Sequence, residues 1–146
     1  MVYMLLGTGF EETEAIAPLD LLRRADIPVM TVGLNGKIIY GSHGIGVEAD
    51  ITIGQMDLTE MDMIVLPGGL GGVASIRSCP EALEAVRFAW ENEKFVAAIC
   101  AGPTVLADLG ITQGKIREVL FSKQFSEFFR NEFIVELFCL ILFIKH

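Results

Sequence analysis

The sequence predicts an α/β fold built on a mostly parallel sheet. Short apolar runs of four or five residues alternate with longer stretches of helical periodicity, which is the pattern of βαβ units. Several of these runs lead directly into glycine-containing turns, as strands that feed helices commonly do. With 146 residues, 52% of them apolar, the chain is long enough to form one domain with its own core.

The predicted strands are short apolar runs bounded by turn residues. In chain order they cover residues 2–6, 28–34, 63–66 and 95–99, with a short edge strand at 46–50. The dipeptide Asn35-Gly36 is a two-residue hairpin signal. It predicts that the strand at 28–34 turns back into residues 37–40.

The predicted helices begin and end at residues that favour helix termini. Residues 11–24 have acidic residues in the first turn and Arg23-Arg24 in the last, an order that the helix dipole favours. A second helix begins at Pro80, because proline is preferred at the first helical position. A third follows Pro103, and Gly110 is its expected C-terminal stop.

The composition changes near residue 115. All 15 glycines and all five prolines lie at or before Gly114, whereas seven of the ten phenylalanines lie at 121–143. We therefore predict an α/β domain at residues 1–114 and an atypical, Phe-rich helical tail at 115–146, consistent with a shifted reading frame. Residues 133–144 are too short for a membrane span. They predict an amphipathic or buried helix, with a helix lying on a membrane surface as the alternative.

Charge and cysteine content narrow the possible partners. The chain has 19 acidic and 11 basic residues and a net charge of −8, the opposite of a nucleic-acid-binding surface. Its three cysteines, Cys79, Cys100 and Cys139, lack the spacing of a metal site. The N-terminus lacks the basic region of a signal peptide. These features predict no nucleic-acid partner, no bound metal and a reducing, cytoplasmic location.

Cys100 is the main candidate for chemistry. It follows the strand at 95–99 and is separated from Pro103 only by Ala101 and Gly102, a strand-to-helix turn comparable to a nucleophile elbow. Because a helix N-terminus favours negative charge, we expect the pKa of the thiol to fall. The alternative is an inert cysteine buried in the core.

Other candidates lie in loops expected at the same edge of the sheet. The run at 67–72 offers backbone N–H groups for an oxyanion, or is a plain tight turn. Three acids are candidate proton donors or bases: Glu11, Glu12 and Glu14. Glu11 and Glu12 are equally well explained as solvated partners of the helix dipole. His43 lies either near a bound substrate or on a surface loop.

Three segments together resemble the ThiJ/PfpI superfamily and, within it, the Parkinson-associated, DJ-type branch. They are residues 9–15 (GFEETEA), 65–69 (VLPGG) and 97–103 (AAICAGP), and the resemblance runs from residue 2 to 114. It implies a flavodoxin-like three-layer sandwich, usually homodimeric and free of cofactors. By position, Cys100 would be the nucleophile and an oxidation-sensitive thiol, and Glu14 would hydrogen-bond to its sulfur. The backbone N–H groups around the oxyanion would come from three residues: Gly69, Leu70 and Ala101.

The activity that the resemblance implies is a cysteine-dependent glyoxalase or protein deglycase acting on reactive dicarbonyls. Relatives are also described as redox-responsive chaperones, as peptidases and as thiazole monophosphate biosynthesis proteins. A redox sensor or chaperone-like protein without turnover is the alternative function, and an inactive, truncated member is a third reading. A glutamine-amidotransferase-like hydrolase ranks below these, because its chemistry needs a histidine and an acid after the cysteine.

This sequence departs from the family pattern after Gly114. The family continues there with further strands and usually supplies a histidine near the thiol. Here nothing after Gly114 matches that region, and the two histidines are His43 and His146. The sheet is therefore expected to be C-terminally truncated relative to the family.

Overall fold

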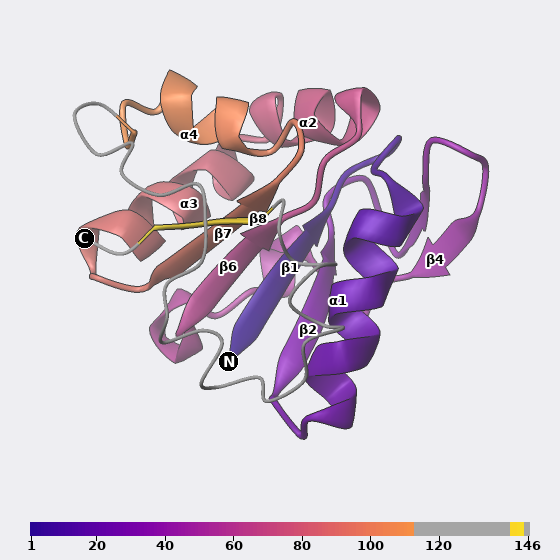
Figure 1. Ribbon diagram of the computed structural model, residues 1–146, viewed down its shortest axis with the longest axis horizontal. Coiled ribbons are helices and arrows are strands. Elements are labelled where there is room, and N and C mark those ends of the chain that lie inside the picture. Colours follow the sequence, from indigo (N-terminus) through magenta and orange to yellow (C-terminus); the bar gives the residue numbers. More distant parts are fainter. Residues whose placement is uncertain (113–140, 145–146) are drawn as a thin grey trace.

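A computed structural model describes residues 1–112 and 141–144. Its main sheet has six strands in the order β5-β2-β1-β6-β7-β8, parallel throughout except for the antiparallel β7–β8 pair. The strands are β1 (Val2–Leu6), β2 (Val29–Gly33), β5 (Ile51–Thr52), β6 (Met63–Leu66), β7 (Phe95–Ile99) and β8 (Ile141–Ile144). The predicted parallel α/β architecture is confirmed (Figure 1).

Helices cover both faces of the sheet and make a three-layer sandwich (Figure 1). One face carries α1 (Glu12–Arg24), and the other carries α2 (Leu70–Arg77), α3 (Pro80–Glu91) and α4 (Pro103–Asp108). Two 3₁₀ turns, η1 (Ile53–Gln55) and η2 (Leu58–Glu60), connect β5 to β6. The helix predicted at 11–24 is confirmed as α1. It begins one residue later than predicted, because Glu11 is its N-cap.

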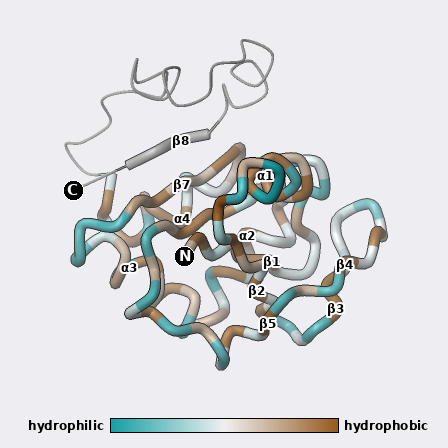
Figure 2. The backbone as a smooth tube through the Cα atoms, turned by 90° about the horizontal axis from the view of Figure 1, so that it is seen from below, coloured by the Kyte–Doolittle hydropathy of each residue, from teal (hydrophilic) through white to brown (hydrophobic). Residues whose placement is uncertain are grey.

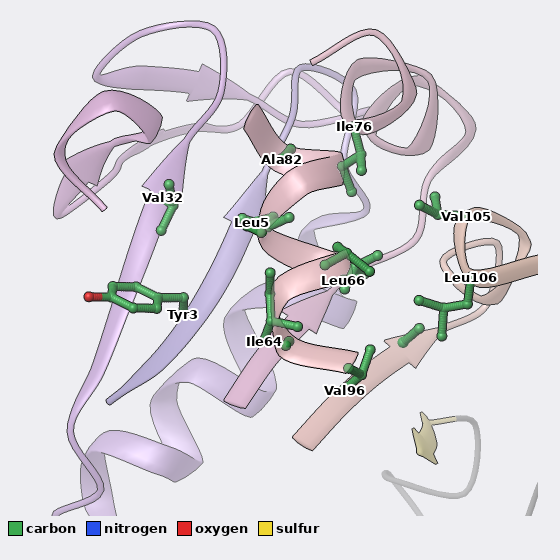
Figure 3. Packing of buried hydrophobic residues seen from close by; sticks show 14 of the residues in the cluster. Tyr3, Leu5, Val32, Ile64, Leu66, Ile76, Ala82, Val96, Val105 and Leu106 are labelled. Atoms are coloured by element: carbon green, nitrogen blue, oxygen red, sulfur yellow. The ribbon is translucent and has the colours of Figure 1, made fainter. Parts of the chain in front are cut away.

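The core is divided between the two faces because side chains of a strand alternate. Tyr3 and Leu5 of β1 point to the side of α2, α3 and α4, where they join Ile64, Leu66 and Val96 (Figure 3). Val2, Met4 and Leu6 point to α1 and pack with Ala15 and Leu19. Burying each large apolar side chain contributes about 1.5–3 kcal/mol, so both layers fix the position of the central strands.

The hairpin predicted at Asn35-Gly36 is wrong. β2 already pairs with β1 and with β5, so it offers no free edge to the next strand. Instead β3 (Ile38–Tyr40) and β4 (Gly46–Glu48) form a separate antiparallel sheet beside the main body (Figure 2). The Asn35 side-chain oxygen accepts hydrogen bonds from the N–H and hydroxyl of Thr8, at 3.0 and 3.2 Å. That contact with the loop after β1 holds the turn.

Helix α2 was not predicted, because its first residues are glycine-rich and glycine disfavours helix. The reason for the glycines is close packing. A Cβ at Gly72 would lie 2.7 Å from the Cα of Phe10, and one at Gly71 would lie 3.0 Å from the Cα of Gly9. Helix α2 thus approaches the loop after β1 at backbone distance.

The C-terminal prediction is corrected in part. Residues 141–144 were expected to be helical, but they form β8 and pair with β7 from Val96↔Ile144 to Ile99↔Ile141. The free edge of β7 provides the hydrogen-bonding partners that make these residues a strand. The rest of the predicted tail helix, Cys139 and His146 lie outside the described residues. Among the described residues, no helix combines the length and apolarity needed to cross a membrane.

Candidate active site

Three loops meet at the carboxyl end of the sheet, as predicted. They follow β1, β6 and β7, and Gly68 lies at their junction. The Glu11 N–H donates to the Gly68 carbonyl at 3.1 Å, and the Gly68 N–H donates to Glu14 Oε2 at 2.9 Å. A Cβ at Gly68 would lie 2.3 Å from Glu14 Oε2 and 2.9 Å from Cys100 Cβ. The carboxylate and the cysteine therefore flank the same glycine.

Cys100 occupies a strained turn directly after β7. Its φ is +55°, a left-handed conformation that costs a non-glycine residue about 1–2 kcal/mol. The Gly102 N–H donates to the Ile99 carbonyl at 2.8 Å and closes the turn. A Cβ at Gly102 would come within 2.6 Å of the Leu66 carbonyl oxygen, so the turn is tightly packed against β6. Cys100 is exposed, and its reading as a buried core cysteine is wrong.

The expected fall in the thiol pKa is also wrong. Partial desolvation of the sulfur is the main cause that raises the pKa of Cys100, followed by the hydrogen bond and negative charge of Glu14 and the more distant charge of Glu11. Only the hydrogen bond from the Ala101 N–H lowers it. The helix after Cys100 has six residues, so its dipole is outweighed by two nearby carboxylates. The resting sulfur is a thiol that faces a carboxylate acceptor.

The structure separates the three acids that the sequence left open. Glu14 is the one beside Cys100. Glu11 is the N-cap of α1, and its Oε2 accepts the Glu14 N–H at 2.7 Å. Glu12 is only 6% exposed, so its interpretation as a solvated partner of the helix dipole is wrong.

Glu12 binds the loop that carries His43. Its carboxylate accepts the His43 N–H at 2.7 Å, contacts His43 Nδ1 at 2.8 Å and accepts the Ser42 hydroxyl at 3.1 Å. Burial opposes ionisation of Glu12, but these hydrogen bonds outweigh it and lower its pKa to about 2. The hydrogen bond to Glu12, then its charge, raises the pKa of His43, and the Glu11 charge acts in the same direction.

Replacing His43 by asparagine is expected to remove a pH-dependent part of the stability. The raised pKa means that folding favours the imidazolium. Its contribution is therefore fully present below the unfolded pKa of about 6.5 and is lost as pH rises through the folded pKa. The Tm difference between wild type and His43→Asn should be larger at about pH 5.5 than at about pH 8.5. An equal difference at both pH values would contradict the pairing with Glu12.

The three backbone donors predicted for an oxyanion lie at the start of α2 and in the turn before α4. Gly69 is the N-cap of α2 and Leu70 its first residue, so their N–H groups have no acceptor within the helix. Ala101 lies in the turn between Cys100 and α4, and its N–H lowers the pKa of the Cys100 thiol. Glu11, Glu12 and His43 bring one potential ligand atom each within 4.8 Å of one another. Since Glu12 and His43 bind each other and Glu11 caps α1, we assign no metal to them.

Comparison with known proteins places this arrangement in a family. The family model described as the DJ-1/PfpI family matches residues 1–117. The chain belongs to the DJ-1/PfpI family. The resemblance seen in the sequence is thereby confirmed, and the matched residues include all three loops around Gly68.

Relatives of this chain include proteins named DJ-1 and proteins named deglycase. Protein dj-1beta of Drosophila melanogaster is 38% identical over 113 residues, which are 77% of this chain and 60% of that protein. Deglycase PfpI of Pyrococcus furiosus is 32% identical over 114 residues, which are 78% of this chain and 68% of that protein. This chain therefore spans about 60% of the length of the Drosophila protein dj-1beta.

Solved structures confirm the flavodoxin-like fold of the family. Oxidized DJ-1 of Toxoplasma gondii superimposes with a TM-score of 0.73 at 33% identity, covering 77% of this chain and 62% of that one. DJ-1beta of Drosophila melanogaster superimposes with a TM-score of 0.71 at 37% identity, covering 75% and 60%.

Proposed function

We propose that this DJ-1/PfpI chain is a cysteine-dependent, cofactor-free glyoxalase or deglycase that acts on reactive dicarbonyls such as methylglyoxal. The observation that carries the proposal is the pairing of an exposed sulfur with a carboxylate across Gly68. The substrate is a small aldehyde or a glycated molecule, and deglycase-named relatives in three Pyrococcus species and Thermococcus kodakarensis support the glycated one.

The first step of the proposed reaction joins the Cys100 sulfur to the aldehyde carbon of the dicarbonyl. The thiol proton passes to the Glu14 carboxylate as the carbon–sulfur bond forms, and Glu14 then gives this proton to the former carbonyl oxygen to complete a hemithioacetal. Because its pKa is raised, the sulfur is protonated before the reaction. A neutral thiol needs an adjacent base when it attacks, and Glu14 is that base. N–H groups of Gly69, Leu70 and Ala101 would stabilise the developing oxyanion.

The second step converts the hemithioacetal into a hydroxy acid. Glu14 removes the proton from the former aldehyde carbon and returns a proton to the neighbouring carbon. The hydroxyl proton of the hemithioacetal moves to the ketone oxygen of that neighbouring carbon, which leaves a lactoyl thioester on Cys100. Water then hydrolyses the thioester, releasing lactate and restoring the thiol. The net reaction adds one water to methylglyoxal and needs no oxidant, reductant or cofactor.

The decisive experiment is lactate production from methylglyoxal in the absence of glutathione. Purified chain should convert methylglyoxal to lactate faster than a buffer control, and the rate should scale with protein concentration. A chain that remains folded by circular dichroism but forms no lactate above buffer would overturn the proposed activity.

Replacing Glu14 by glutamine is expected to lower the rate of lactate formation about 10²-fold or more, the usual contribution of a positioned general base. The same change removes a negative charge beside Cys100, so alkylation of the thiol by iodoacetamide should shift to lower pH. Measured on one protein preparation, the variant should therefore form lactate more slowly than wild type but be alkylated faster at a given pH. Lower turnover with an unchanged alkylation profile would argue against contact between Glu14 and the sulfur.

A redox-sensing or chaperone-like role without turnover is the second candidate, favoured by the different surroundings of the two described cysteines. Cys100 is exposed, whereas Cys79 is half-buried at the N-cap of α3 and packs against the core. Mild peroxide should therefore oxidise Cys100 to sulfenic and then sulfinic acid before it modifies Cys79. Peptide mass spectrometry measures the order, and equal oxidation of both cysteines would count against this role.

The proposal also covers oligomeric state, substrate vicinity, location and partners. The homodimer implied by the resemblance is supported by exposed apolar side chains on the β3–β4 hairpin, at Ile38, Tyr40 and Ile45. His43, 72% exposed at its side chain, is proposed to lie in the vicinity of the substrate. The cytoplasm remains the predicted location, and neither a nucleic acid nor a membrane is proposed as a partner.

A further inference from the structure

We propose that Glu12 is a positioning residue whose buried carboxylate holds the loop at 41–44 against the first turn of α1 and thereby keeps Glu14 beside Cys100. The inference rests on the role given to Glu14 in the proposed function. It assigns a role in the site to an acid that touches neither the sulfur nor the glycine between the two reactive groups.

Both oxygens of Glu12 are engaged by the loop. Oε1 accepts the His43 N–H at 2.7 Å, and Oε2 contacts His43 Nδ1 and the Ser42 hydroxyl at 2.8 and 3.1 Å. The loop backbone also lies against the carboxylate, since a Cβ at Gly41 would be 2.3 Å from Oε1. Because the Glu12 side chain is only 8% exposed, its carboxylate depends on such partners, since a buried charge without them is costly.

The loop is joined in turn to the segment that leads into α1. The Ser42 N–H donates to the Phe10 carbonyl at 2.8 Å, and the Gly9 N–H donates to the Tyr40 carbonyl at 2.8 Å. Glu11, which follows Phe10, donates its N–H to the Gly68 carbonyl and accepts the Glu14 N–H with its side chain. Loop 41–44 and the site around Gly68 therefore share one short stretch of backbone.

The helix directs its two acids to different sides. Residues two positions apart in a helix lie about 200° apart around its axis, so Glu12 faces the loop while Glu14 reaches Gly68 and Cys100. A rotation or shift of this first turn would move both carboxylates together. Fixing Glu12 in the loop thus limits the positions that Glu14 can take.

The test measures the pH profile of iodoacetamide alkylation at Cys100 in the full chain. Glu12→Gln should shift the profile to lower pH and raise the rate at about pH 7 at least about twofold, because Glu14 then spends less time beside the thiol. Asp20→Asn is the matched control. It removes a carboxylate from the same helix, where Asp20 pairs with Arg24 on the surface, and should leave the profile unchanged.

A double-mutant cycle shows whether Glu12 acts through Glu14. In a Glu14→Gln background, Glu12→Gln should produce no further shift of the alkylation profile. A shift of equal size in both backgrounds, or no shift in either, would overturn the proposal. If Glu12→Gln does not fold, His43→Ala replaces it, since the exposed His43 side chain donates to Glu12 from the loop side. His43→Ala should shift the profile in the same direction, and an unchanged profile would overturn the proposal.

The alkylation readout is independent of turnover. A chain that forms no lactate but shows the Glu12-dependent shift would remove the proposed activity and retain the positioning role. A chain that forms lactate but shows no Glu12-dependent shift would retain the proposed activity and remove the positioning role.

Discussion

Replacing Cys100 by serine is expected to reduce lactate formation from methylglyoxal at least about 10³-fold, because a hydroxyl in the same place is a far weaker nucleophile than a thiol or thiolate. The carbon–sulfur bond of the proposed hemithioacetal cannot form without this atom. Serine is close in size to cysteine and has to adopt the same φ of +55°, so the variant should keep a Tm near that of wild type. Lactate assays and thermal unfolding on the same preparation measure both effects.

The matched control for this prediction is Cys79→Ser. Cys79 is half-buried at the N-cap of α3, and serine is a favourable N-cap residue. Cys79→Ser should therefore keep the wild-type rate of lactate formation. Equal rates for wild type and Cys100→Ser would remove the proposed chemistry, whatever Cys79→Ser does.

Replacing Gly69 by alanine is expected to destabilise the fold by roughly 3 kcal/mol or more. Its φ of +84° is unfavourable for a residue with a side chain, at a cost of about 1–3 kcal/mol. The added Cβ would also lie 2.6 Å from the Glu11 nitrogen and 2.6 Å from the Gly9 carbonyl oxygen. Both contacts are backbone atoms of the loop after β1, so they cannot be relieved by a change of rotamer. Urea unfolding followed by circular dichroism measures the loss.

Gly44→Ala separates the cost of backbone strain from the cost of the steric contacts of the added Cβ. Gly44 also has a positive φ, +79°, but an added Cβ there would meet nothing within 4 Å. The cost should therefore be limited to backbone strain, about 1 kcal/mol. A loss of stability at Gly69→Ala no greater than at Gly44→Ala would show that α2 and the loop after β1 are not in close contact.

The pair of Glu14 and Cys100 has a chemical consequence that differs from the one expected for a helix N-terminus. A thiolate stabilised by a dipole is reactive without help, but it is also readily oxidised. Here partial desolvation and Glu14 raise the thiol pKa, so the resting sulfur keeps its proton, and in the proposed reaction the carboxylate takes that proton. The pH profile of alkylation tests this directly, and it bears on both candidate functions.

The sequence was sufficient to predict the main strands and helices of the α/β layer, because these depend on local signals. Apolar runs at 2–6, 63–66 and 95–99, the proline at the start of α3 and the glycine after α4 all act within a few residues of themselves. The turn at Cys100 was predicted for the same reason. Cys100 directly follows a strand, and only Ala101 and Gly102 separate it from the proline that begins the next helix.

The errors arose where distant segments decide the outcome. Asn35-Gly36 has the local signature of a hairpin, but β5 takes the edge of β2 that the returning strand would need. The glycines at 71 and 72 disfavour helix locally, yet α2 forms there because only glycine lets it approach Gly9 and Phe10 so closely. Residues 141–144 form a strand because β7 has an edge to pair with.

The order of the main strands and the position of Cys100 between a strand and a helix were determined by the sequence alone, through periodicity and turn residues. Only the tertiary structure decided which of three neighbouring acids reaches that sulfur, that Glu12 instead binds the loop of His43, and that the thiol pKa rises. Those outcomes depend on how far apart charges lie and how much water surrounds them. Both quantities are set by packing between segments as distant as Glu14, Gly68 and Cys100.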